Sequence, residues 1–107
     1  MRTDALTKAL ELTAEKVSPE VQLNTLLTFL FVAAKGTCTQ QEVMDYLNTS
    51  NAGASRNISY WTERRFDRQP GMGFIERVQD EHDRRYRHVT TTKRGKDFYA
   101  ALQKAMA

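Results

Sequence analysis

The chain has 107 residues, of which 40% are hydrophobic and 27% are charged, and its net charge is +3. This length and composition suit one globular domain and exclude a disordered or fibrous chain. The longest apolar stretch, Leu26 to Ala34, is too short to cross a bilayer, so neither membrane insertion nor secretion is expected. The single cysteine, Cys38, cannot form an internal disulfide, which agrees with a reducing compartment.

The positive charge is concentrated in the second half of the chain. Residues 1–55 carry four Lys or Arg and six Asp or Glu, for a net charge of −2. Residues 56–96 carry eleven Lys or Arg and six Asp or Glu, for a net charge of +5. This distribution fits a surface that faces a polyanion, because each neutralised phosphate releases counterions. A solvated charged face has the same composition, so the order of the elements has to decide between the two.

The first part of the chain predicts two helices. The first is capped at Thr3 or Asp4, and its apolar residues recur at helical spacing on one side: Leu6, Leu10, Ala14 and Val17. The segment Ser18 to Glu20, Ser-Pro-Glu, is a strong start signal for the second helix. We expect that helix to run to about Ala34, with Gly36 as its stop.

The next segment predicts two further helices joined by a tight turn. Thr39 and Glu42 form a capping box, Thr-x-x-Glu, for a helix that ends near Leu47. Ser50 is the expected N-cap of the following helix, whose core side is formed by Ala54, Ile58 and Trp61. Two consecutive helices at such a turn are typical of a helix-turn-helix, in which the first helix braces the second against a duplex.

After Phe66 the pattern changes from helix to strand. Residues 69–73, QPGMG, form a connecting loop, and Phe74, Ile75 and Val78 predict a strand. The polar residues 79–85 form a hairpin tip, and residues 86–91 are the returning strand. Thr92 then caps a last helix, in which Phe98, Leu102 and Ala105 repeat at helical spacing. A charged hairpin after a helix-turn-helix indicates a wing.

Three stretches of this pattern carry a family resemblance. Residues 47–61, LNTSNAGASRNISYW, look like a turn and recognition helix. Residues 73–85, GFIERVQDEHDRR, look like a strand and a wing that ends in an acid followed by arginines, and Thr92 and Gly95 match a Thr-x-x-Gly entry to the next helix. In these features, and in element order over residues 18–102, the chain resembles the MarR family of bacterial winged-helix regulators. It departs from the family in a longer link over residues 62–72 and in Thr91, where an apolar residue is common.

The resemblance implies a fold class that is mainly α with a small β-hairpin, a winged helix-turn-helix. The single domain over residues 1–107 would have an N-terminal helix (1–17), the helix-turn-helix and wing (18–91), and a C-terminal helix (92–107). It further implies a homodimer held by the terminal helices and a sequence-specific regulator, a repressor, that binds double-stranded DNA. Such a protein would lie in the cytoplasm, associated with the nucleoid, in a bacterium or phage.

The recognition helix supplies the candidate base-reading residues. Its predicted outward side consists of Ser50, Asn51, Ala52, Ser55, Arg56, Ser59 and Tyr60. Arg56 suits guanine and Asn51 suits adenine, because their side chains match the hydrogen-bonding edges of these bases. Ser55 and Tyr60 better suit phosphates, and the preceding helix start, Thr39 and Gln40, is expected to contact phosphate as well. The alternative is a solvated helix face.

The wing supplies the second candidate surface, formed by Asp83, Arg84, Arg85 and Arg87. By resemblance, one arginine enters the minor groove while the aspartate orients it. A narrow minor groove concentrates negative potential, so a cationic tip gains affinity there with little base discrimination. The alternative is a hairpin tip that only confers solubility.

No residues suggest catalysis, a metal or a cofactor. His82 and His88 lack further spaced ligands, and Trp61 continues the apolar stripe of its helix as a core residue. Cys38 is expected to be partly buried beside a helix cap, with a redox-sensing thiol as the alternative. Two other functions stay open: a winged helix that docks a protein partner, and an architectural or replication-associated DNA binder without site preference.

Overall fold

The computed structural model describes residues 3–65, 68–79 and 87–107. Within these residues, five helices and three strands follow one another in the order α1 (Thr3–Lys16), α2 (Leu23–Lys35), β1 (Thr37–Thr39), α3 (Gln40–Leu47), α4 (Asn51–Tyr60), β2 (Ile75–Gln79), β3 (Arg87–Thr91) and α5 (Lys93–Met106). The predicted fold class, a winged helix-turn-helix, is confirmed. Strand β1 was not predicted, and it completes a three-stranded antiparallel sheet in the order β1-β3-β2.

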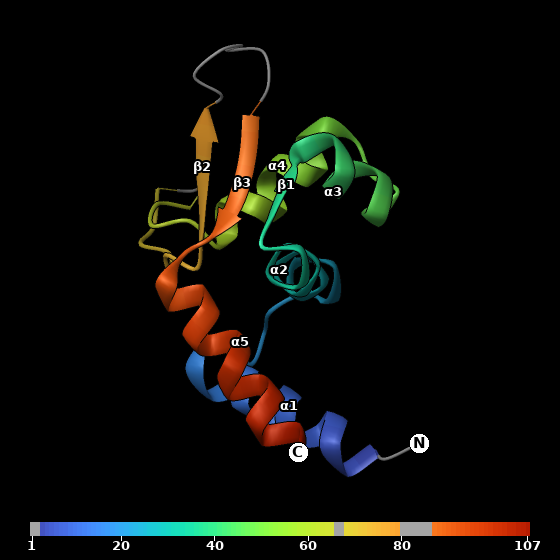
Figure 1. The fold of residues 1–107 in the computed structure, drawn as a ribbon, viewed down its shortest axis with the longest axis vertical. Helices are drawn as coiled ribbons and strands as arrows, with labels where there is room; N and C mark the ends of the chain where they lie inside the picture. The colour runs from blue at the N-terminus through green and yellow to red at the C-terminus, as the bar shows by residue number, and fades with distance from the viewer. Residues whose placement is uncertain (1–2, 66–67, 80–86) are drawn as a thin grey trace.

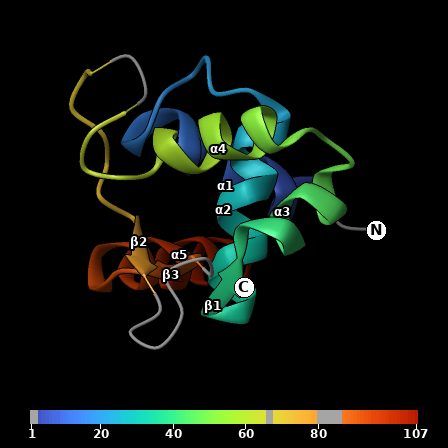
Figure 2. The ribbon, with the colours of Figure 1, turned by 90° about the horizontal axis from the view of Figure 1, so that it is seen from above.

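The molecule is elongated, measuring 44 × 27 × 26 Å. Helices α1 and α5 lie side by side at one end, and the β2-β3 hairpin extends toward the other (Figure 1). Helices α3 and α4 pack beside α2, and the sheet lies on a different side of α2 from α4 (Figure 2). The helix-turn-helix and the hairpin therefore share the end of the molecule opposite the α1-α5 pair.

The predicted helix boundaries are confirmed at most of the caps. The Thr39 and Glu42 capping box is present, the Ser50 and Thr92 hydroxyls accept the amides of Gly53 and Gly95, and Gly36 ends α2 at a positive φ of 84°. These signals are local, because each of these caps bonds a residue three or four positions away.

The predicted start of the second helix at Ser18 is wrong. Helix α2 begins at Leu23, and its N-cap, Gln22, makes no side-chain cap bond. The Ser18 hydroxyl instead accepts the Glu20 amide at 3.1 Å within a turn. Serine favours such turns for the same reason that it favours caps, because its hydroxyl accepts a nearby backbone amide, and here the pattern stabilises a turn instead of a helix start.

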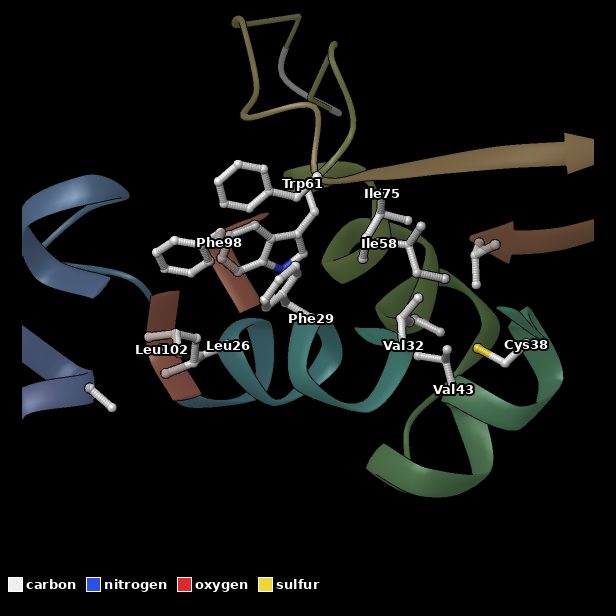
Figure 3. Close-up of a cluster of buried hydrophobic side chains, with 14 residues drawn as sticks. Leu26, Phe29, Val32, Cys38, Val43, Ile58, Trp61, Ile75, Phe98 and Leu102 are labelled. Carbon is white, nitrogen blue, oxygen red and sulfur yellow. The ribbon is translucent and has the colours of Figure 1, made fainter. Parts of the chain in front are cut away.

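An aromatic cluster forms the core (Figure 3). The Phe29 ring lies 5.1 Å from Trp61 and 5.6 Å from both Phe74 and Phe98, measured between centroids, and Trp61 stacks on Phe74. The expected core side of α4 is confirmed, because Ala54, Ile58 and Trp61 are fully buried. The Trp61 indole N–H donates to the Thr25 carbonyl at 2.7 Å, so this buried polar group is satisfied.

The apolar stripe of α1 is only partly used by the core. The buried residues of α1 are Ala9 and Thr13, which lie outside the predicted stripe, whereas Leu6 and Leu10 of the stripe are 49% and 46% exposed. Helix α1 packs against α5, and its two exposed leucines stay at the rim of the contact.

Two residues of the β3-α5 junction explain how the last helix packs. Thr91, which departs from the family pattern, is buried, and its hydroxyl donates to the Val32 carbonyl at 3.3 Å near the end of α2. Gly95 lies so close to the Phe74 carbonyl that a β-carbon there would clash with backbone. This close approach is a physical reason for glycine at the fourth position of Thr-x-x-Gly.

We predict that Trp61→Phe lowers the free energy of unfolding by about 1–3 kcal/mol, because it removes the indole's buried hydrogen bond to the Thr25 carbonyl and leaves space where the larger ring packed. The measurement is urea denaturation followed by circular dichroism. Tyr60→Phe, at the adjacent half-buried aromatic, is the control and should change stability by less than about 0.5 kcal/mol. Equal midpoints for wild type and Trp61→Phe would contradict the assigned role.

Cys38 lies in β1 opposite Val89 and is buried, 3% exposed, rather than partly buried as predicted. Burial, followed by the charge of Glu42, raises the pKa of its thiol to about 11. A raised pKa keeps the sulfur protonated at neutral pH, and the protonated thiol is less reactive than the thiolate.

We therefore predict that Cys38 reacts slowly with a disulfide reagent in the folded protein at about pH 8, and that denaturant accelerates the reaction by about a hundredfold or more. Reagent absorbance against time measures both rates. A folded-state rate equal to that in denaturant would show that the thiol is accessible, and would reopen the redox-sensing alternative.

Candidate nucleic-acid interface

Helix α4 is the predicted recognition helix, and its outward side is exposed. Ser50, Asn51, Ala52 and Arg56 are exposed, and Ser55 and Tyr60 are half-buried. Arg56 is thus placed where the sequence predicted it. The prediction for Ser59 is wrong, because this residue is buried, 7% exposed, where α4 faces β2.

The helix is held at its N-terminal end by α3. The Gln40 amide donates to the Asn51 side-chain oxygen at 2.7 Å, so two candidate DNA-contacting residues are bonded to each other. The preceding residue, Thr39, is engaged in the capping box with Glu42. The Thr39 backbone amide, followed by Lys35, lowers the pKa of Glu42, so this cap weakens only when the pH falls into the acidic range.

Contacts that the sequence analysis did not identify hold the inner side of α4 to α2. The Thr25 hydroxyl of α2 donates to the Asn57 side-chain oxygen of α4 at 2.7 Å. The Asn57 amide in turn donates to the Gly53 carbonyl, one turn earlier in α4, at 3.1 Å. A β-carbon at Gly53 would meet the Thr49 hydroxyl, so a larger residue at this position would require the Thr49 side chain to move.

Strand β2 holds the flank of α4 through Arg77. Its guanidinium donates from one terminal nitrogen to the Ser59 hydroxyl at 3.1 Å, and from the other to the Ser55 carbonyl at 3.0 Å and hydroxyl at 3.1 Å. Arg77 was not singled out from sequence. Two serines one helical turn apart are a weak signal by themselves, and only the fold places the strand beside them.

The wing is described only in part. Strands β2 and β3 pair in antiparallel register, with Ile75 opposite Thr91 and Gln79 opposite Arg87. The Gln79–Arg87 pair is therefore the last one before residues 80–86, at the end of the strands farthest from α5. The predicted contacts of Asp83, Arg84 and Arg85 lie outside the described residues.

An apolar groove opens at the opposite end of the molecule, between α1, α5 and α2. Its volume is about 280 Å³, and its lining residues are Leu6, Ala9, Leu10, Thr13, Leu26, Leu30, Tyr99, Leu102, Gln103 and Met106. Met106 is 47% exposed, like Leu6 and Leu10. Three large apolar side chains thus border one groove on the surface of the isolated chain.

Within the part of the chain that the structure describes, no helix has both the length and the apolar character to cross a membrane. Over the same residues, no three or more His, Cys, Asp or Glu side chains are grouped where they could share a metal ion. The expectation that the protein uses neither metal nor cofactor stays a prediction.

No protein-family model matches the sequence, and no curated protein matches it by sequence. Solved structures do match its fold. A MarR-like transcriptional regulator from Thermotoga maritima gives a TM-score of 0.66 at 22% identity, covering 81% of this chain and 56% of that one. The RV1404 protein of Mycobacterium tuberculosis gives a TM-score of 0.71 at 18% identity, covering 95% of this chain and 64% of that one.

A third match is a MarR mutant from E. coli complexed with operator DNA, with a TM-score of 0.67 at 16% identity, covering 96% of this chain and 69% of that one. The chain thus spans 56% and 64% of the lengths of the first two matched proteins. At these identities the likeness establishes architecture: the chain has the winged helix-turn-helix fold of the MarR-like transcriptional regulators.

Proposed function

We propose that this chain is one winged-helix domain that binds double-stranded DNA in a sequence-specific manner and represses transcription. The observation that carries the proposal is α4, a ten-residue helix with Arg56 exposed on its outer side, beside a hairpin whose sequence is rich in arginine. A fold neighbour crystallised with operator DNA supports the same reading.

The recognition chemistry follows from the side chains on α4. Arg56 carries a planar fork of donors that fits guanine O6 and N7 in the major groove. Asn51 can pair with adenine, and its bond to Gln40 presents the two amides together at the start of the helix. Ser55, Tyr60 and Thr39 fit phosphates, which fix the register of the helix without reading sequence.

The wing supplies affinity rather than sequence discrimination. Arg84, Arg85 and Arg87 follow one another closely in the hairpin sequence, and the minor groove next to a bound major groove attracts such cations. Because β2 and α4 are bonded through Arg77, the hairpin and the recognition helix reach the duplex as one unit. Occupying an operator in this way represses by excluding other proteins from the promoter.

A homodimer follows from the apolar groove of α1 and α5. Exposed leucines at a groove rim lose unfavourable contact with water when a second copy covers them. A two-fold axis there would use the same surface on both copies, and it would present two recognition helices to a palindromic site.

Arg56→Ala is predicted to lower the preference for the bound consensus over random duplex by about tenfold or more, because one bidentate base contact contributes about 1–3 kcal/mol of discrimination. Selection from a random duplex pool first defines the consensus, and fluorescence anisotropy then measures affinity for both duplexes. Lys104→Ala, in the last turn of α5, is the matched control and should leave the preference unchanged.

Arg85→Ala is predicted to lower affinity for both duplexes and to reduce the salt slope by about one, without altering preference. Two results would refute the proposed function: equal affinity of the wild type for both duplexes, as an architectural binder gives, or no duplex binding at all. A protein partner that survives nuclease treatment would then favour the docking module.

Leu10→Asp is predicted to shift the protein from dimer to monomer, because it places a charge at the rim of the apolar groove. Sedimentation velocity measures the assembly, and circular dichroism checks the fold. Leu23→Asp is the control, since Leu23 is 71% exposed and does not line the groove. If both variants stay dimeric, the interface lies elsewhere.

A further inference from the structure

Arg77 links the wing strand to the recognition helix. Along β2 side chains alternate between the two faces of the sheet, so Arg77 shares a face with Ile75, which is buried in the core with Ile58 of α4. The strand register places Arg77 opposite Val89 of β3. Its side chain is therefore directed toward α4 by the same pairing that builds the hairpin.

The contact depends on the shape of the guanidinium. Ser55 and Ser59 lie one helical turn apart on the same side of α4, and the two terminal nitrogens of Arg77 reach one serine each, with bonds of 3.0 to 3.1 Å. A planar fork spans this distance with its donors held in fixed directions. A lysine carries the same charge on a single nitrogen and cannot make both contacts in this geometry.

The core does not fix this part of the helix on its own. Ala54, Ile58 and Trp61 hold the inner side of α4, whereas Ser55 lies at its edge and is half-buried. Base readout requires side chains within a fraction of an ångström of their partners, so the edge of the helix that faces the wing has to be positioned too.

We propose that Arg77 is a positioning residue for DNA recognition: by joining Ser55 and Ser59 to β2, it fixes the recognition helix relative to the wing and thereby sets operator preference. This role rests on the proposed function. It assigns Arg77 a task different from that of Arg56 or the wing arginines, because it acts on the helix and not on a phosphate.

The test is a double-mutant cycle on operator preference, measured with the full chain on consensus and random duplexes over a range of salt concentrations. Arg77→Gln is expected to lower the preference about tenfold while the salt slope stays unchanged. Arg77→Lys is expected to behave like Arg77→Gln despite its charge. Arg94→Gln, at the exposed start of α5, is the charge-matched control and should retain the wild-type preference.

Ser59 supplies the second position of the double-mutant cycle. Ser59→Ala is expected to lower the preference in the wild-type background and to add no further loss to Arg77→Gln, because both changes remove the same bond. Ser59→Ala also keeps the experiment informative if Arg77→Gln unfolds, since it removes only one hydroxyl.

The outcomes separate the two proposals. A wild type without operator preference refutes the proposed function itself. If the wild type does have that preference, three results would overturn the role of Arg77. The first is wild-type operator preference in Arg77→Lys, and the second is additive losses of preference from Arg77→Gln and Ser59→Ala. The third is a salt slope reduced by about one in Arg77→Gln, which would make Arg77 a direct phosphate contact.

Discussion

The hydrogen bond from the Trp61 indole to the Thr25 carbonyl, 2.7 Å long and buried in the aromatic cluster, is the contact on which the rest of the structure depends. It joins the end of α4 to the start of α2. At the same residue the backbone turns toward the sheet, because the Trp61 carbonyl accepts the amides of both Phe74 and Ile75. Three elements thus meet at one residue, through its side chain and its backbone carbonyl. The direction in which the hairpin leaves the core and the angle at which α4 crosses α2 are both fixed there.

Helix α4, the proposed recognition helix, is consequently held on three sides within the isolated chain. Trp61 and Asn57 secure it to α2, Gln40 secures its first residue to α3, and Arg77 secures its flank to β2. Each of these bonds is made by a side chain rather than by the helix backbone. If α4 binds DNA as proposed, it would lose little conformational freedom on binding, and little of the binding free energy would be spent on ordering the helix.

Local signals in the sequence predicted the elements, and nonlocal contacts explain what it missed. The caps at Thr39 and Ser50 bond residues three positions away, so they are readable from a short window. Strand β1 has only three residues, and Thr37 pairs with Thr90, 53 residues later. No pattern within so short a segment predicts that pairing. The Arg77 contact spans 18 residues and depends on the register of the hairpin. The burial of Ser59 follows from that contact, which is why helical periodicity alone placed it on the outer side.

The two ends of the molecule differ in surface chemistry, one basic and the other with an apolar groove. This division would let the proposed DNA binding and the proposed dimerisation use separate surfaces of a small chain. The basic region begins at Arg56 on α4 and runs through the wing, whereas the α1-α5 end carries an apolar groove with Leu6 and Leu10 at its rim. If two copies joined through those grooves, the two-fold axis would lie far from the cationic ends, and like charges would be kept apart. Joining through the basic ends would bring the positive regions together and cover the outer side of α4, which the proposed function needs exposed. Charge repulsion and apolar burial therefore favour the same arrangement, in which assembly and recognition do not compete for surface.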